Sequence, residues 1–361
     1  MEMYKKILVV DDSALMRRVL CDIINSDKGF QVVDRATNGL EAFDLLSRKQ
    51  YDAVVLDVNM PKMNGLELLK ELQKFKISAK VMMASTDTRE GAKTTLDALE
   101  LGALDFVHKP DNAVDCRTED FKEHMLDTLA AVADAKAPVF TTEAKKREEE
   151  ATTRKMVEIV QKSAKAVTGN KVVALACSTG GPKALQSVIP KLPAGLKCPV
   201  VIVQHMPKGF TASLAERLNT LSEVTVKEAE EGDVLKAGWV YLARGGVHLN
   251  VKTGRDGKYT IHYSDEPTRE GVKPCANYMY ESLMDSNYDQ IVCVVMTGMG
   301  ADGTKGIQNL VTKKKVHVIA QDQNTCAVYG MPKSIVATGL TNQVVPLEQI
   351  AQEIILNVGV M

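Results

Sequence analysis

The sequence predicts an α/β protein with two doubly wound parallel-sheet domains. Short apolar runs of strand type alternate with amphipathic helical patterns in two separate parts of the chain, as in parallel sheets covered by helices. The chain has 361 residues, of which 45% are hydrophobic, which is enough for two ordinary cores. A charged stretch with little apolar periodicity separates the two parts. We therefore expect one domain at residues 1–124, a linker at 125–168 and a second domain at 169–361.

The composition excludes some classes of partner. The 45 Lys and Arg residues balance 46 Asp and Glu residues, so a formal net charge of -1 offers neither a basic surface for nucleic acid nor a polybasic patch for a membrane. No segment approaches the roughly 18 apolar residues of a membrane span, and the chain begins without the apolar region of a secretion signal. We expect a cytoplasmic protein with protein or small-molecule partners and no membrane insertion. The seven cysteines form no C-x-x-C pair and are interpreted as reduced thiols.

Five strand-like runs organise the first domain: Ile7–Val10, Val32–Ala36, Ala53–Leu56, Lys80–Met83 and Asp105–His108. In a doubly wound sheet, the site lies beyond the carboxyl ends of the strands. Four of these ends carry acids, a hydroxyl or an amine: Asp11 and Asp12, Asp57, Ser85, and Lys109. Each acid taken singly could merely face water. Three crowded carboxylates would repel one another, however, and an oxygen-rich site with open positions suits Mg²⁺.

The same side chains suit phosphoryl transfer onto a carboxylate. Asp57 would be the nucleophile, the metal and Lys109 would neutralise phosphate oxygens, and Ser85 would donate a hydrogen bond.

Three segments of this domain resemble the motifs of response-regulator receiver domains: Val9–Ser13, Leu56–Gly65 and Phe106–Pro110. The resemblance covers the whole first domain and implies a flavodoxin-like fold. It implies that Asp57 accepts a phosphoryl group from a cognate histidine kinase. It places Asp12 and the Asn59 carbonyl on Mg²⁺, with Asp11 and Asp57 alongside, and makes Ser85 and Phe106 the switch pair. A receiver controls something else, so the output should lie in the rest of the chain.

The linker carries no catalytic signal. Residues 125–165 contain no glycine and one proline, Pro138, and a charge run occupies 145–150. We expect a solvated, partly helical tether, with the alanine-rich part near 130–137 extending the last helix of the first domain.

The second domain shows six strand-like runs, three helical patterns and one hairpin. The strands are expected at Val172–Ala176, Val200–Val203, Val224–Val226, Trp239–Ala243, Ile291–Met296 and Val316–Ala320, the helices at Thr211–Leu221, Ala276–Met284 and Gly306–Val311, and the hairpin strands at Val247–Val251 and Tyr259–Tyr263.

The most informative stretch is the apolar run 172–177, which ends at Ser178 and passes through two glycines into a helix beginning near Pro182. Such a turn leaves the hydroxyl bare beside unpaired helix N–H groups that can hold an oxyanion, so Ser178 is a candidate nucleophile. The nucleophile-elbow pattern has glycine two residues before the serine, where this chain has Ala176. A phosphate-cradling turn and a plain strand-to-helix turn stay open as alternatives.

A serine nucleophile needs a base and an acid from neighbouring strand ends. His205 directly follows the run 200–203 and is the expected base, with His248 as the alternative. Asp302 lies in a glycine-flanked loop after the run 291–296 and is the expected acid, with Asp322 as its rival. The order Ser, His, Asp differs from that of the standard α/β-hydrolase, so a different serine hydrolase fold is predicted.

Four segments resemble the catalytic domain of the chemotaxis protein-glutamate methylesterases: Ser178–Pro182, Gln204–Phe210, Thr297–Gly303 and Ala320–Pro332. The resemblance implies hydrolysis of glutamyl methyl esters on cytoplasmic chemoreceptor helices, without a cofactor and often with deamidation of receptor glutamines. Ser178 would attack the ester, His205 would shuttle the proton and Asp302 would orient the imidazole, with backbone N–H groups near Thr179 and Met299 as the oxyanion hole. The receiver would cover the cleft until it is phosphorylated.

Two other functions remain possible at this stage: a non-catalytic, receiver-controlled binding module, and an enzyme acting mainly as a glutamine deamidase. The sequence differs from the family pattern at Ala176, at Arg244 and in the segment 273–277, which we expect on a wall of the active site.

Overall fold

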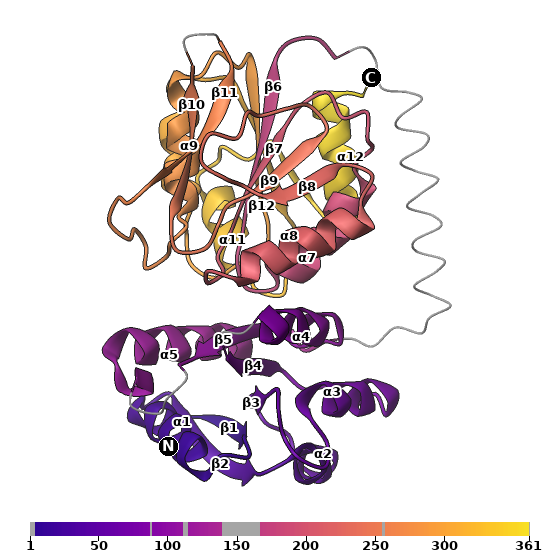
Figure 1. Ribbon diagram of the computed structural model, residues 1–361, viewed down its shortest axis with the longest axis vertical. Coiled ribbons are helices and arrows are strands. Elements are labelled where there is room, and N and C mark those ends of the chain that lie inside the picture. Colours follow the sequence, from indigo (N-terminus) through magenta and orange to yellow (C-terminus); the bar gives the residue numbers. More distant parts are fainter. Residues whose placement is uncertain (1–3, 87–88, 111–114, 139–166, 255–256, 361) are drawn as a thin grey trace. The chain divides into compact units, whose positions relative to one another are not determined.

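The computed structural model describes residues 4–86, 89–110, 115–138, 167–254 and 257–360 (Figure 1). The chain divides into two compact units, residues 1–141 and 142–361, and each unit has its own parallel sheet covered by helices. This confirms the predicted fold class. Among the described residues, no helix combines the length and the apolarity needed to span a membrane.

The first unit is a five-stranded sheet with the order β2-β1-β3-β4-β5. Its strands are β1 (Lys5–Val10), β2 (Phe30–Ala36), β3 (Ala53–Asp57), β4 (Val81–Thr86) and β5 (Asp105–Lys109), and all neighbours pair in parallel. Because β1 is flanked by β2 on one side and β3 on the other, the carboxyl end of β1 is a topological switch point, as in flavodoxin-like sheets.

Five α-helices cover this sheet: α1 (Ala14–Ser26), α2 (Gly39–Arg48), α3 (Gly65–Lys74), α4 (Arg89–Glu100) and α5 (Glu119–Asp134). Helices α1 and α5 contact each other, while α2 contacts α3 and α3 contacts α4. The starts of three helices follow from the sequence, since Ser13, Asn38 and Asn64 accept hydrogen bonds from backbone N–H groups three residues further on.

The first domain extends beyond the predicted boundary at residue 124, which falls inside α5. Met125, Leu129 and Val132 recur at helical spacing and are fully buried, so the second half of α5 belongs to the core of the first unit. The alanine-rich composition conceals this apolar stripe in the sequence. Most of the predicted linker, residues 139–166, lies outside the described residues.

The second unit contains a seven-stranded parallel sheet with the order β14-β13-β12-β6-β7-β9-β8. The strands are β6 (Lys171–Cys177), β7 (Val200–Gln204), β8 (Thr225–Glu228), β9 (Trp239–Leu242), β12 (Gln290–Val295), β13 (Val316–Gln321) and β14 (Gln343–Val345). The predicted hairpin is present as the antiparallel pair β10 (His248–Thr253) and β11 (Tyr259–Ser264). Strand β14 has only three residues, too few for a pattern to predict it.

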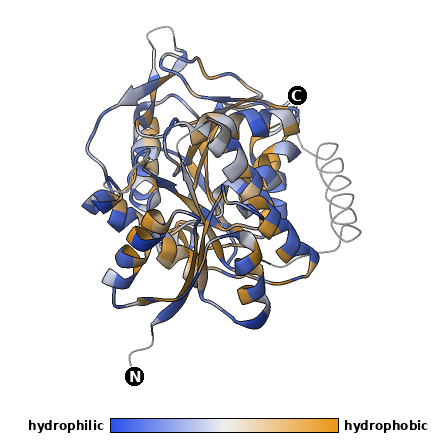
Figure 2. Cartoon of the chain, turned by 60° about the horizontal axis from the view of Figure 1, so that its bottom comes forward, coloured by the Kyte–Doolittle hydropathy of each residue, from blue (hydrophilic) through white to orange (hydrophobic). Residues whose placement is uncertain are grey.

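Helices pack on both sides of this sheet: α7 (Gly181–Val188), α8 (Phe210–Leu221), α9 (Ala276–Ser282), α10 (Thr304–Leu310), α11 (Gly330–Ala337) and α12 (Leu347–Val358). One buried cluster joins side chains of β6, β7 and β12 to α9, α10, α11 and the hairpin. Helix α12 contacts α7 and the strands β6, β12 and β13. Figure 2 shows hydrophobic residues concentrated on the central strands and hydrophilic residues on the outer helix faces.

Candidate functional site

Three neighbouring strands bring the predicted catalytic residues to one edge of the second sheet. Ser178 follows β6, His205 follows β7, and the loop 297–302 follows β12, and β6 lies between β12 and β7 in the sheet. In the register, Ala176 pairs with both Val203 and Val295, so the three strands end at the same level. This edge is the switch point of the sheet, where α/β proteins place their sites.

The turn after β6 holds Ser178 tightly while leaving its hydroxyl available. Its backbone N–H donates to Thr297 O at 2.9 Å, and its carbonyl accepts from Gly181 N at 2.6 Å. A Cβ on Gly298 would lie 2.8 Å from Ser178 Cβ, so only glycine permits this close approach. Ser178 is half-buried, and within the described part of the chain its Oγ makes no hydrogen bond. The hydroxyl is therefore free to turn toward a base.

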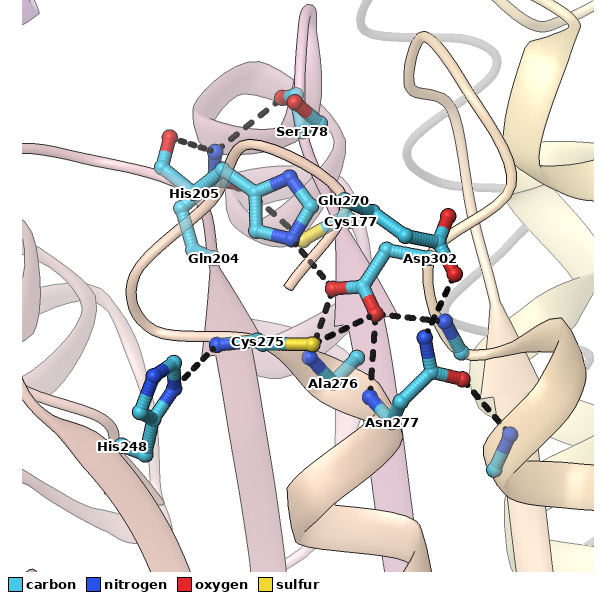
Figure 3. Close-up of polar contacts among 12 residues, drawn as sticks. Cys177, Ser178, Gln204, His205, His248, Glu270, Cys275, Ala276, Asn277 and Asp302 are labelled. Atoms are coloured by element: carbon cyan, nitrogen blue, oxygen red, sulfur yellow. Dashed lines mark hydrogen bonds and ion pairs between the residues drawn. The ribbon is translucent and has the colours of Figure 1, made fainter. Parts of the chain in front are cut away.

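His205 and Asp302 meet directly. His205 Nε2 lies 2.8 Å from Asp302 Oδ2, and the two side chains are 10% and 3% exposed. A carboxylate only accepts hydrogen bonds, so Nε2 carries the proton and Nδ1 keeps a lone pair. Figure 3 shows the imidazole ring between Asp302 and Ser178. This arrangement provides a base that faces the serine.

Four other donors converge on Asp302. Its Oδ1 accepts from the N–H groups of Asn277 at 3.0 Å and Gly303 at 2.8 Å and from Cys275 Sγ at 3.0 Å, while Oδ2 also accepts from Ala276 N at 2.6 Å. Burial alone would raise the pKa of this carboxyl, but the hydrogen bond and charge of His205, together with the hydrogen bonds from Ala276 and Cys275, lower it below its ordinary value of 3.8. Asp302 is thus held ionised beside the imidazole.

The two rival residues have other contacts. His248 is fully buried at the start of β10, and its Nδ1 accepts from Cys275 N at 3.1 Å; burial and the charge of Lys273 lower its pKa. Asp322 follows β13 and accepts from the backbone N–H and hydroxyl of Thr325, so it closes its own loop. The structure therefore brings His205 and Asp302 together and gives His248 and Asp322 supporting positions.

Within the segment 273–277, which was expected on a wall of the active site, residues 275–277 lie against Asp302. All three are fully buried and contact Asp302, so their role is to hold the acid. A periodic pattern cannot show this contact, because it depends on α9 beginning beside the loop after β12. The other two departures lie elsewhere: Ala176 is buried within β6, and the Arg244 guanidinium lies 4.8 Å from the ring centre of Tyr263.

The expected oxyanion-hole residues lie on the two loops beside Ser178. Thr179 is buried and its carbonyl accepts from the hydroxyl of Thr297 at 2.9 Å, whereas Met299 is 41% exposed. In the described part of the chain, no group accepts a hydrogen bond from the backbone N–H of either residue. Both N–H groups are therefore available to a bound oxyanion.

The acids of the first unit also gather at one sheet edge. Carboxylate oxygens of Asp11, Asp12 and Asp57 lie within 4.8 Å of one another. Lys109 Nζ donates to Asp57 Oδ1 at 2.7 Å and to Asp11 Oδ2 at 2.9 Å. Burial raises the pKa of Asp57, with a further contribution from the Asp11 charge, and Lys109 opposes the rise. Burial alone would lower the pKa of Lys109, but the two carboxylates raise it.

The other residues predicted for the receiver site lie in β4, in β5 and in the loop after β3. Ser85 is the second-last residue of β4 and Phe106 lies in β5, and both are buried, whereas Asn59 is exposed in the loop after β3.

Sequence reasoning assigned no role to Gln204, the residue before His205. It is buried and hydrogen-bonds to the backbone of both Ser178 and His205. The sequence held two signals: Gln204 begins the segment Gln204–Phe210 that carries the family resemblance, and it ends an apolar strand, where a polar residue needs buried partners.

Fold and site together define an α/β protein that joins a phosphoacceptor-type acidic cluster to a hydrolase-type arrangement of serine, histidine and aspartate. Residues 173–354 match the CheB methylesterase family, and residues 7–118 match the response regulator receiver domain. The chain therefore belongs to the CheB methylesterase family and carries a receiver domain.

Relatives match the chain over almost its whole length. The protein-glutamate methylesterase/protein-glutamine glutaminase 1 of Syntrophomonas wolfei is 40% identical, over 97% of this chain and 98% of that protein. The protein-glutamate methylesterase/protein-glutamine glutaminase of Bacillus subtilis is 40% identical, over 97% of both chains. The crystal structure of the Thermotoga maritima CheB methylesterase catalytic domain is 41% identical with a TM-score of 0.50, over 52% of this chain and 98% of that one.

Proposed function

We propose that this chain is a phosphorylation-activated serine esterase that hydrolyses glutamyl methyl esters on the cytoplasmic helices of chemoreceptors. The observation that carries this proposal is the 2.8 Å contact between His205 and Asp302 at the sheet edge where Ser178 presents a hydroxyl that no described group binds. Family membership supports the reaction class, and the names of the relatives indicate the glutamyl substrate.

The chemistry follows from the protonation states at the site. His205 Nδ1 takes the proton of Ser178 as its oxygen attacks the ester carbonyl, and the N–H groups of Thr179 and Met299 hold the oxyanion. When the tetrahedral intermediate collapses, His205 passes the proton to the leaving methoxy group, so methanol departs and a glutamyl-serine ester remains. Water then attacks this acyl-enzyme by the same route and releases glutamate and free Ser178. Asp302 keeps Nε2 protonated and stabilises the imidazolium that forms in each step.

The first unit supplies the control. We infer that Asp57 accepts a phosphoryl group from a cognate chemotaxis histidine kinase, and that Ser85, Phe106 and Lys109 respond to the phosphoryl group. The three carboxylates of Asp11, Asp12 and Asp57 lie close together, and Lys109 supplies one ammonium group beside them. The site is therefore rich in oxygen ligands and fits a hard divalent cation. Mg²⁺ would be held by Asp11, Asp12, Asp57 and the Asn59 carbonyl, and when bound it neutralises charge on phosphate oxygens.

The test is turnover of a methylated receptor fragment by the full chain, with methanol as the product measured. Wild type should release methanol and Ser178→Ala should not. A covalent serine probe should label wild type and leave Ser178→Ala unlabelled. A folded wild type that neither releases methanol nor reacts with the probe would favour the non-catalytic binding module.

A second activity, deamidation of receptor glutamine, uses the same residues and releases ammonia in place of methanol. It is favoured by the glutaminase activity in the names of the relatives. Comparing ammonia and methanol release from paired glutamine and methyl-ester fragments measures which leaving group the site prefers.

A further inference from the structure

Gln204 is a buried amide between the two loops that carry the candidate nucleophile and base. It ends β7 with 1% of its surface exposed. Its Nε2 donates to Ser178 O at 3.1 Å and to His205 O at 3.0 Å, and its Oε1 accepts from Cys177 Sγ at 3.0 Å (Figure 3). Carbonyl oxygens only accept hydrogen bonds, so the orientation of this amide is fixed by its partners.

The hydrogen bond from Gln204 to Ser178 O also determines the direction of the Thr179 N–H. The carbonyl of Ser178 and the N–H of Thr179 belong to one planar trans peptide and point in opposite directions. Gln204 Nε2 and Gly181 N hold that carbonyl at 3.1 and 2.6 Å. Fixing the carbonyl therefore fixes the direction of the Thr179 N–H, which no described group accepts.

The second N–H of the Gln204 amide holds the backbone of His205, the candidate base. Because it goes to His205 O, one NH₂ group links the backbones of the nucleophile and the base across β6 and β7. The fold keeps space for this link: a Cβ on Gly181 would overlap Gln204 Oε1. Gly181 is thus required for the amide to lie where it does, apart from any need for a special backbone conformation.

We propose that Gln204 is a positioning residue that aims the Thr179 N–H at the oxyanion and keeps the Ser178 and His205 backbones in register. This inference rests on the proposed esterase function and extends it to a residue that touches neither substrate nor the reacting atoms. Its effect lies in transition-state stabilisation, since an N–H aimed at the oxyanion position acts on the developing charge more than on the ester ground state.

The test compares Gln204→Met with Gln321→Met in the full chain. Gln321 is equally buried at the end of β13, where its Oε1 accepts from Thr297 N at 2.8 Å and its Nε2 donates to Thr325 O at 2.8 Å. It therefore matches the loss of buried amide bonds but makes no bond of its own to the Ser178–Thr179 peptide, which it reaches only through Thr297. A complete loss of one oxyanion donor costs about 10²–10³-fold, so misaiming it should lower kcat by roughly 10–100-fold with KM within about twofold. Gln321→Met should lower the unfolding temperature comparably and kcat by less than about threefold.

Two further readouts separate positioning from simple destabilisation. Affinity for a boronate inhibitor, which mimics the oxyanion, should fall in Gln204→Met in parallel with kcat, while the pH dependence of kcat keeps its shape. Gly181→Ala provides a variant with a different structural cost, since its methyl group would overlap the Gln204 amide and lie 3.1 Å from Cys177 Sγ, while the Gln204 side chain itself is retained. It should reproduce the fall in kcat and boronate affinity even if Gln204→Met does not fold.

Equal kcat in wild type and Gln204→Met, or in wild type and Gly181→Ala, would overturn the positioning role. So would equal losses of kcat in Gln204→Met and Gln321→Met. An inactive wild type would instead overturn the proposed function itself, so the two failures are distinguishable.

Discussion

Replacing Asp302 by asparagine tests the geometry of the site most directly, because an amide changes the charge while keeping the shape. Oδ1 of Asp302 receives three donors, from Cys275, Asn277 and Gly303, whereas Oδ2 receives those of His205 and Ala276. The single amide oxygen of asparagine should stay where three donors converge. Its NH₂ group would then face His205 Nε2.

A donor at that place forces the wrong tautomer on the imidazole. His205 Nε2 would have to accept, so its proton would move to Nδ1, and the ring could no longer take the proton of Ser178. Loss of the correct tautomer costs up to about 10⁴-fold in kcat in a serine protease triad. The NH₂ group would also face Ala276 N, which leaves some freedom for rearrangement, so we expect a fall of roughly 10³-fold with little change in KM.

The assay is steady-state methanol release from a methylated receptor fragment, with thermal unfolding measured in parallel. Asp322→Asn is the matched control, since the Asp322 carboxylate accepts from the backbone N–H and hydroxyl of Thr325 in its own loop, and the variant should retain kcat within about threefold. If Asp302→Asn kept kcat within threefold of wild type while folding normally, or if Asp322→Asn were equally damaging, the assignment of Asp302 as the acid would be refuted.

Three other outcomes are expected. Ester turnover by wild type should rise on addition of a small phosphodonor and Mg²⁺, and Asp57→Asn or excess EDTA should abolish that rise; a response in Asp57→Asn would contradict the phosphoacceptor assignment. Cys275→Ser keeps a donor to Asp302 and should hold kcat within about twofold, whereas Cys275→Ala loses it and should lower kcat by roughly 2- to 10-fold, so equal rates would show that the thiol contact is idle. Because the pKa of Asp302 is depressed below 3.8, its ionisation stabilises the fold above that pH and the stabilisation is lost as pH falls through the folded-state pKa. The difference in free energy of unfolding between wild type and Asp302→Asn, measured in urea, should therefore shrink below about pH 4, and a constant difference down to pH 3 would count against it.

The strand ends could be predicted from the sequence because each is marked by an apolar run followed by a polar residue. Ser178 and His205 were identified in this way. The choice between Asp302 and Asp322 is different, since it depends on which strands are neighbours. Strand β12 lies beside β6, whereas β13 lies one strand further out, and that places Asp302 in reach of the base.

Contacts between loops were beyond reach of any periodic pattern. Residues 275–277 are buried against Asp302, and Gln204 donates two hydrogen bonds to the backbone of neighbouring loops. Both arrangements depend on single polar groups that are far apart in the sequence. The end of the first domain was misplaced for a related reason. In α5 the apolar positions are diluted by alanines, so the burial of its second half becomes visible only when it packs on the sheet.

The pairing of β6 with β12 has a consequence for biosynthesis. Lys171 pairs with Gln290 and Ala176 with Val295, so the strand that precedes Ser178 can pair with β12 only after residues 290–295 have been synthesised. A nascent chain that has emerged only as far as the hairpin would contain Ser178 and His205 but not the acid or the loop that flanks the serine. Such an intermediate should be hydrolytically inert, which would protect neighbouring proteins from an unregulated esterase during translation, since long-range strand pairing is a late event in folding.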